Sequence, residues 1–287
     1  LSLSFHAAAK TDRGVRRRES PNQDNVLAVQ VARLHEGKPQ AFGLFIVADG
    51  MGGHSFGREA SSRAIEVMAD DILQPLLDGQ PLTEEQVLAI LKAGAEHANA
   101  ELHHENLRQH ADMGTTVTAA LVISDLAHII NVGDSRTYHL KLDQPLIQVT
   151  NDHSVVAGLV AAGVIRPEDI YTHPRRNQIY RSLGERDEVQ IDTFQVALQP
   201  GDRLLLCSDG LWEMVRDPRI EEILRGTGDP HAATEQFIEE ANANGGVDNV
   251  SAIVVEMTDE RSIPSQTGMH YLASPETIKR HPLPRQS

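Results

Sequence analysis

Aspartates stand at the edges of several apolar runs in this sequence, where the ends of β-strands are expected. Asp49, Asp134 and Asp209 come just after an apolar run, whereas Asp24 and Asp248 come just before one. In an antiparallel sheet the end of one strand lies beside the start of its neighbour, so these carboxylates could meet at one sheet edge. Such a cluster needs cations or protons, because neighbouring like charges raise each other's pKa. An oxygen-only site favours Mg²⁺ or Mn²⁺ over Zn²⁺.

A plainer interpretation is that each Asp-Gly pair is ordinary turn chemistry. The near-copies Asp49-Gly50 and Asp209-Gly210, with further aspartates at strand edges, weaken that interpretation. The run Gly50–His54 lacks the last glycine of a dinucleotide fingerprint and the Gly-Lys-Ser/Thr of a P-loop. It offers backbone carbonyls near a metal. His54 could donate a proton, or it could be a polar residue at a helix start.

The elements that would position these aspartates are mainly short strands. The predicted strands are Asn25–Val31, Gly43–Ala48, Val117–Ser124, Ala127–Val132, Arg136–Lys141, Gln190–Val196, Arg203–Cys207 and Ser251–Met257. Ser124-Asp125 and Gly133-Asp134 separate successive strands, which predicts a run of hairpins and largely antiparallel sheets.

Helices interrupt these strands at a few places. They are predicted over Gly57–Leu77, from a capping box at Thr83 to about His110, and from a cap at Asp229 to about Asn242. The stretch Asn151–Glu188 carries only short helical pieces. Sheets with segregated helices indicate an α+β layered sandwich.

Composition narrows the class of protein. The net charge of −15 argues against a general nucleic-acid binder, and no apolar run reaches the ~18 residues of a spanning helix. The single cysteine, Cys207, excludes a disulfide framework and a cysteine-cluster zinc site, and it suits a reducing cytoplasm. We expect one domain over residues 1–258, followed by a flexible tail or linker over 259–287, where Pro, Ser, Thr and His accumulate without periodicity.

Eight short stretches, which run in order over about residues 5–257, carry a family resemblance. They are Thr11–Asp24, Val47–His54, Met113–Thr116, Asn131–Arg136, Thr150–Ser154, His173–Asn177, Leu206–Trp212 and Asp248–Ser251. Together they resemble the metal-dependent Ser/Thr protein phosphatases of the PPM (type 2C) family, in the form common in bacteria. Each stretch alone is weak, whereas eight in order are very specific.

The resemblance implies a four-layer α-β-β-α sandwich of two mainly antiparallel sheets, with two Mg²⁺ or Mn²⁺ ions in a cleft at one sheet edge. By position, Asp49 would bridge both ions and the Gly50 carbonyl would bind one of them. Asp209 and Asp248 would hold the other ion, and Asp24 would act mainly through a coordinated water.

Further positions follow from the same resemblance. Asp134, helped by Asp209, would form a weaker third metal site, and residues 151–188 look like a mobile flap. An arginine would grip the substrate phosphate. Because Arg16 and Arg18 flank Arg17, the phosphate-binding arginine is ambiguous by one position. The Gly-x-x-Arg spacing favours Arg17.

The proton donor is less directly matched. Animal members carry a histidine after the first Asp-Gly, where this chain has Met51, so His54 is the natural substitute. The expected reaction is hydrolysis of phosphoserine and phosphothreonine in proteins, by a hydroxide that bridges the two metals. Arg17 would neutralise the phosphoryl oxygens, and His54 or a metal-bound water would protonate the leaving oxygen.

Two alternatives remain at this point. One is a metal-dependent hydrolase of another phosphoester, and the other is a phosphatase-like binding module without metals. Such a module should lack one of Asp49, Asp209 and Asp248, and all three are present. We expect phosphoproteins as partners, including a Ser/Thr kinase or its substrates, and a cytoplasmic monomer with no membrane span and no nucleic-acid partner.

Overall fold

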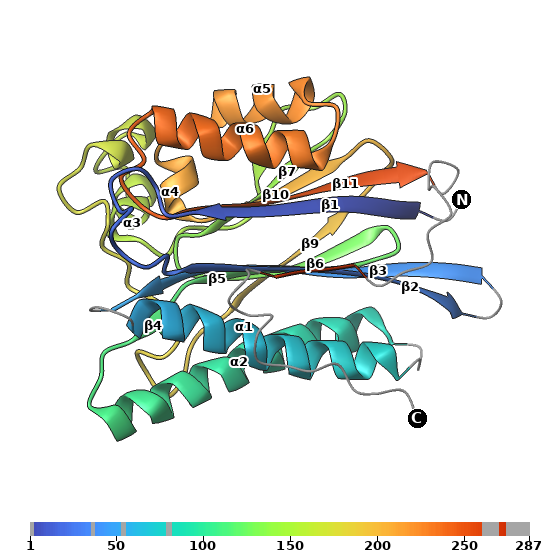
Figure 1. The fold of residues 1–287 in the computed structure, drawn as a ribbon, viewed down its shortest axis with the longest axis horizontal. Coiled ribbons are helices and arrows are strands. Elements are labelled where there is room, and N and C mark those ends of the chain that lie inside the picture. The colour runs from blue at the N-terminus through green and yellow to red at the C-terminus, as the bar shows by residue number, and fades with distance from the viewer. Residues whose placement is uncertain (1–2, 36–37, 53–55, 79–81, 260–269, 274–287) are drawn as a thin grey trace.

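Two sheets packed face to face form the centre of the computed structural model (Figure 1). It describes residues 3–35, 38–52, 56–78, 82–259 and 270–273. The strands are β1 Leu3–Asp12, β2 Asp24–His35, β3 Lys38–Met51, β4 Gly114–Thr115, β5 Val117–Ile123, β6 Leu126–Val132, β7 Arg136–Leu140, β8 Ile147–Gln148, β9 Asp192–Ala197, β10 Arg203–Cys207, β11 Val250–Asp259 and β12 His270–Ala273. One sheet has the order β1-β11-β10-β7-β8 and the other β12-β2-β3-β5-β6-β9, with β4 beside β3. The strand pairs are antiparallel, as predicted.

Helices cover both outer faces and complete the expected α-β-β-α sandwich (Figure 1). They are α1 Phe56–Leu77, α2 Glu84–Gln109, α3 Val155–Ala161, α4 Asp209–Trp212, α5 Asp217–Gly226 and α6 Pro230–Ala243, with a 3-10 helix, η1, at Pro167–Tyr171. The α1–α2 pair covers the larger sheet, and α5 and α6 cover the smaller one. The four-layer prediction is therefore confirmed.

Three apolar layers hold the sandwich together, and β10 shows how. Leu205 and Cys207 pack under α4–α6, whereas Leu204 and Leu206 enter the core between the two sheets. Successive side chains of a strand point to opposite faces. Because both faces of β10 are covered, the strand appears in the sequence as a continuous apolar run rather than an alternating one.

The predicted helices begin where their capping signals indicated. The Thr83 hydroxyl accepts from the Gln86 backbone N–H in a capping box, and the Asp229 carboxylate accepts from the Ala232 N–H. All eight predicted strands are present within a few residues of the expected bounds. An unpredicted strand, β1, pairs with β11 over its whole length. Its central residues are alanines, which are depleted in strands.

The hairpin predicted at Gly133-Asp134 is wrong. β6 belongs to the larger sheet and β7 to the smaller one, so the chain crosses between sheets at this point. Gly133 has φ +105°. A Gly-Asp pair marks a change of direction but does not specify which sheet the next strand joins.

Part of the predicted tail forms a strand. Residues 270–273 form β12, which pairs with β2. The remainder of 260–287 lies outside the described residues. The boundary at residue 258 stays a prediction.

Candidate metal centre

Two pairs of strand ends bring four aspartates to one end of the sandwich, the end at which β4 and α4 lie in Figure 1. Asp24 and Asp49 stand directly opposite each other on β2 and β3. Asp209 follows β10 as the first residue of α4, and Asp248 precedes β11, the neighbour of β10. The predicted meeting of strand ends with strand starts is therefore confirmed for both pairs.

These aspartates interact electrostatically. Burial raises the pKa of Asp49, and the charges of Asp24, Asp209, Asp248 and Asp134 raise it further. Burial also raises the pKa of Asp24 to about 6, although a hydrogen bond from a serine opposes the change. For Asp134, burial and then a nearby carboxylate raise the pKa to about 7. The structure thus brings all five predicted aspartates into one cluster that disfavours negative charge.

Some carboxylate oxygens of the cluster are not satisfied by the surrounding protein and could bind a cation. Oδ1 of Asp24 and Oδ1 of Asp209 are buried and have no hydrogen-bond partner among the described residues. A buried carboxylate oxygen without a partner is costly unless a proton or a cation compensates it. No three His, Cys, Asp or Glu side chains of the described part already stand in metal-binding geometry. The aspartates are neighbours whose oxygens suit a hard divalent ion, rather than a finished coordination shell.

Both Asp-Gly pairs need their glycine for space, not for a turn. A Cβ on Gly50, within β3, would lie 1.8 Å from the carbonyl oxygen of Gly57 at the start of α1. A Cβ on Gly210, within α4, would lie 1.9 Å from the carbonyl oxygen of Asn249. Neither glycine has a positive φ. The turn interpretation is therefore wrong for both, because each glycine allows a second segment of backbone to pass where a Cβ would stand.

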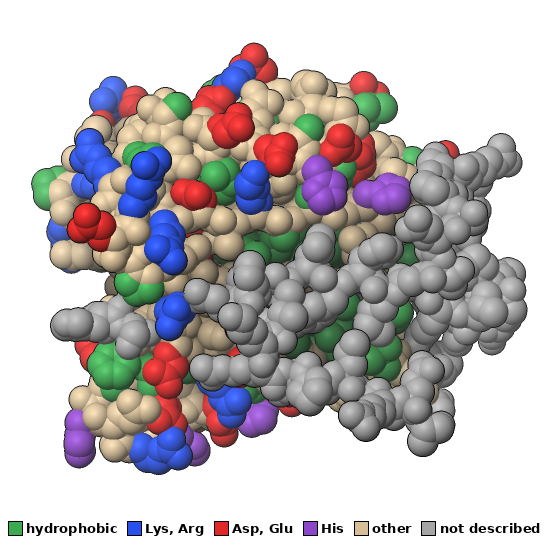
Figure 2. Space-filling view, in the orientation of Figure 1, with side chains coloured by type: hydrophobic (Ala, Val, Ile, Leu, Met, Phe, Trp, Pro, Cys, Tyr) green, Lys and Arg blue, Asp and Glu red, His purple; other side chains and the backbone are tan. Residues whose placement is uncertain are grey.

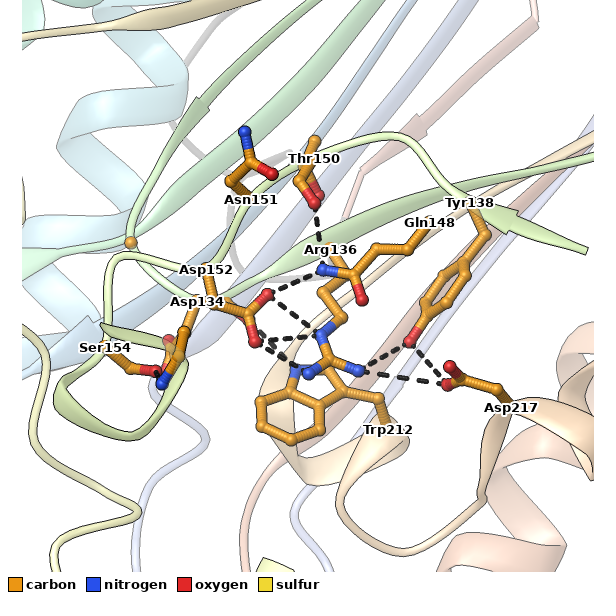
Figure 3. A network of polar contacts seen from close by, with 12 residues as sticks. Asp134, Arg136, Tyr138, Gln148, Thr150, Asn151, Asp152, Ser154, Trp212 and Asp217 are labelled. Carbon is orange, nitrogen blue, oxygen red and sulfur yellow. Dashed lines mark hydrogen bonds and ion pairs between the residues drawn. The ribbon is translucent and has the colours of Figure 1, made fainter. Parts of the chain in front are cut away.

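Backbone contacts fix the place of Asp134 (Figure 3). The indole Nε1 of Trp212 donates to the Asp134 carbonyl at 2.9 Å. The preceding N–H, from Gly133, donates to Nδ1 of the buried His153 at 3.0 Å. The Arg136 guanidinium lies 3.7 Å from the centre of the Trp212 ring and pairs with Asp152 at 2.7 Å. Asp134 is thus held from both the α4 side and the start of the flap.

The arginine loop, residues 13–18 between β1 and β2, lies against Asp248. Arg17 Nη2 is 2.8 Å from Asp248 Oδ2, whereas Arg16 and Arg18 are exposed. This contact supports the middle arginine as the one that faces the cluster. His54 lies outside the described residues, so its predicted role stays a prediction.

Glu213 belongs to the cluster and was missed. It is buried one helical turn after Asp209, and its charge raises the pKa of both Asp134 and Asp209. Burial raises its own pKa, against the favourable charge of Arg176, whose Nε lies 3.6 Å from Oε2. The i, i+4 spacing of two acids would have been the signal, because it places both on one helix face. Because the sequence pattern predicts no helix after Asp209, this spacing carried no structural meaning on its own.

Known proteins resemble this chain in sequence. Residues 12–243 match the family model described as Protein phosphatase 2C. The serine/threonine phosphatase stp of Listeria monocytogenes serotype 4b (strain F2365) is 39% identical over 254 residues, which are 88% of this chain and 96% of that protein. Protein phosphatase PhpP of Streptococcus pneumoniae serotype 2 (strain D39 / NCTC 7466) is 35% identical over 218 residues, 76% of this chain and 87% of that one.

Solved structures share the fold. The Mycobacterium tuberculosis serine/threonine phosphatase PstP/Ppp has a TM-score of 0.74 and 32% identity, over 90% of this chain and 100% of that one. The catalytic domain of PstP in complex with 2 manganese ions has a TM-score of 0.73 and 33% identity, over 90% of this chain and 100% of that one. These structures agree with the two helix-flanked antiparallel sheets seen here.

Proposed function

The chain belongs to the protein phosphatase 2C family, and from that membership we propose which of its residues bind metal, bind phosphate and donate a proton in a metal-dependent serine/threonine protein phosphatase. The two alternatives, a metal-free binding module and a hydrolase of another phosphoester, are not favoured. The observation that carries the assignment is the convergence of charge on Asp49. Asp49 lies opposite Asp24 on the neighbouring strand, and the charges of Asp24, Asp209, Asp248 and Asp134 all raise its pKa, which suits a ligand shared between two ions.

The remaining ligands follow from their surroundings. Asp209 and Asp248, from adjacent strand ends, would hold one ion together with Asp49, and the Gly50 carbonyl would serve the other. Oδ2 of Asp24 accepts from the Ser208 hydroxyl at 2.7 Å, while Oδ1 has no partner in the described part. That single open oxygen supports a contact through water.

A third, weaker site would use carboxylates at the flap side of the cluster. Asp134 and Glu213 both interact with Asp209 and are buried. Arg176 already balances part of the Glu213 charge. A site that must compete with an arginine for its ligand should bind a cation more weakly than the sites at Asp49.

The catalytic roles then divide between the cations and the chain. When bound, the two ions supply Lewis-acid activation of the attacking water. Arg17, which pairs here with Asp248 and has a side chain that is 40% exposed, would donate to the phosphoryl oxygens and neutralise their charge. We propose His54 as the donor of a proton to the departing serine or threonine oxygen.

We also propose that this protein acts in the cytoplasm as a monomer on phosphoproteins, including a Ser/Thr kinase or its substrates. None of the described helices has the length and apolar character of a membrane span. Among the large apolar side chains exposed in the described part, Leu77 lies on α1 and Leu107 on α2, whereas Leu142 and Val164 lie in loops. The net charge of −15 supports the absence of a nucleic-acid partner.

Phosphate release from a phosphothreonine peptide tests this assignment. After exhaustive chelation we expect no turnover, and Mn²⁺ or Mg²⁺ should restore it. Asp209→Ala should stay inactive at saturating Mn²⁺, whereas the matched control Asp125→Ala, in an exposed turn, should match the wild type. Turnover in EDTA, or an active Asp209→Ala protein, would contradict the proposed centre.

A further inference from the structure

Arginines without an acidic partner gather in the arginine loop. Arg17 pairs with Asp248, but Arg13, Arg16 and Arg18 form no ion pair within the described part of the chain. Elsewhere, ion pairs with acidic residues engage Arg63, Arg108, Arg136, Arg166, Arg176, Arg181, Arg186, Arg203, Arg219 and Arg225. Most arginines named here thus have an acidic partner, whereas Arg13, Arg16 and Arg18 of the loop do not.

Two exceptions within the described residues lie in or against the flap. Arg175 donates to the Gln178 side chain, and Arg216 lies 3.3 Å from the centre of the Tyr171 ring. The segments that carry Arg175 and Arg216 both neighbour α4. On the face shown in Figure 2, Lys and Arg side chains gather toward the left end, whereas Asp and Glu side chains are spread across it. The arginine loop is the dark-blue connection between β1 and β2 at that end of Figure 1.

The loop has a defined place beside the metal centre. Its backbone folds into consecutive turns, with the Arg17 N–H donating to the Gly14 carbonyl and the Ser20 N–H donating to the Arg17 carbonyl. The Arg16 N–H donates to the Gly246 carbonyl at 2.9 Å. Gly14 has φ +76°, and a Cβ there would lie 2.0 Å from the Asp248 carbonyl oxygen. The side chains of Arg13, Arg16 and Arg18 are exposed from this anchored backbone.

Local acids do not neutralise the loop. Asp12 accepts from the Gly14 N–H and from the Asn242 side chain, and Glu19 forms no ion pair with a described arginine. The whole chain carries a net charge of −15, so the loop is a basic segment in an acidic protein. Guanidinium groups bind carboxylate and phosphate oxygens through paired N–H donors. The loop therefore offers donors for anions next to the site where Arg17 meets the cluster.

We propose that the arginine loop selects phosphoproteins whose phosphorylated residue is flanked by anionic groups, either acidic side chains or a second phosphate. This inference rests on the proposed function, in which the reacting phosphate lies beside Arg17. An extended peptide advances about 3.3 Å per residue, and neighbouring Cα atoms of the loop are about 3.8 Å apart. Arg16 and Arg18 are therefore spaced to meet residues within a few positions of the phosphorylated one.

Matched phosphothreonine peptides test the proposal. They differ only in flanking residues, which are Glu, Gln, Lys or phosphoserine, and p-nitrophenyl phosphate serves as a substrate without flanks. The variants are Arg16→Gln/Arg18→Gln and the control Lys92→Gln, which removes a charge from the exposed face of α2. Thermal unfolding checks that each variant is folded. The measurement is kcat/KM with Mn²⁺ at 0.05 and 0.5 M NaCl.

We expect the wild type to prefer Glu flanks over Lys flanks at low salt, with about two- to fivefold coming from each arginine. High salt should reduce the preference, because exposed charges are screened. The double variant should lose the preference yet hydrolyse p-nitrophenyl phosphate normally, and Lys92→Gln should match the wild type. A larger gain with phosphoserine than with Glu would assign the loop to multiply phosphorylated segments, and equal gains would assign it to acidic side chains.

Two results would overturn the proposal in distinguishable ways. If the wild type hydrolyses all peptides equally, or the double variant keeps the preference, the arginine loop does not select substrates although the phosphatase assignment stands. If the wild type with Mn²⁺ hydrolyses neither the peptides nor p-nitrophenyl phosphate, the proposed function fails and this inference fails with it.

Discussion

Replacing Asp134 by Asn should stabilise the metal-free protein, by an amount that grows with pH. Burial raises the pKa of the Asp134 carboxyl to about 7, Asp152 adds to the rise, and Arg136 opposes it. The group is therefore protonated in the folded protein at pH 5 and charged at pH 8. Asn has nearly the same shape as Asp but carries no charge at either pH, so the substitution removes the cost of burying a carboxylate.

The size of the effect follows from the difference between the folded and unfolded pKa. A raised folded pKa contributes stability that is present below the unfolded value and is lost as pH rises through the folded value. With 3.8 for the unfolded chain, folding costs about 1–2 kcal/mol at pH 5, where the carboxyl must take up a proton, and about 4 kcal/mol at pH 8, where it is buried as a carboxylate. The free energy of unfolding of Asp134→Asn should therefore exceed that of the wild type by about 2–3 kcal/mol more at pH 8 than at pH 5. This increase corresponds to roughly 5–10 °C in Tm.

Thermal unfolding followed by circular dichroism measures this directly. Wild type, Asp134→Asn and the control Asp125→Asn are compared in EDTA at pH 5, 6, 7 and 8. Asp125 lies exposed in the turn between β5 and β6, so its variant should follow the wild type at every pH. At pH 8 with saturating Mn²⁺ the advantage of Asp134→Asn should shrink or reverse, because a bound cation compensates the carboxylate.

A pH-independent difference in Tm would refute this reasoning, as would an Asp134→Asn protein that is less stable than the wild type at pH 8 in EDTA. Either result would mean that Asp134 is not a buried carboxylate with a raised pKa, and that its surroundings already satisfy the charge.

Three further outcomes are expected. Arg17→Ala should raise KM for a phosphothreonine peptide more than it lowers kcat, because the guanidinium binds phosphate in both the ground and transition states; a loss in kcat alone would contradict this. Trp212→Phe removes the hydrogen bond to the Asp134 carbonyl, so calorimetry should show about 10- to 100-fold weaker Mn²⁺ binding at the weak site and unchanged tight sites. Arg176→Gln frees Glu213 and should strengthen weak-site binding a few-fold, about the worth of an ion pair whose arginine is exposed to solvent. The adjacent control Arg175→Gln should not, and equal titrations would refute the competition.

The sequence by itself determined which aspartates meet. The lengths of the apolar runs specify where strands end, and antiparallel pairing places an end beside a start. The sequence predicts only that the five aspartates can meet at one sheet edge, whereas the strand registers of the structure place Asp24 opposite Asp49 and Asp209 and Asp248 at the adjoining ends of β10 and β11. Helix starts were equally local, because a capping residue and its partner are only three positions apart, as at Thr83.

The tertiary structure alone decided which sheet each segment joins and which distant groups complete the site. The crossing at Gly133-Asp134 and the Glu213–Arg176 pair depend on contacts between segments that no local pattern links. The same holds for the glycines after two of the aspartates. Gly50 and Gly210 resemble turn residues in the sequence. They are needed because the backbone carbonyls of Gly57 and Asn249 lie where a Cβ on these two residues would stand. Local patterns encode propensity over a few residues, whereas close approach is set by packing of the whole chain.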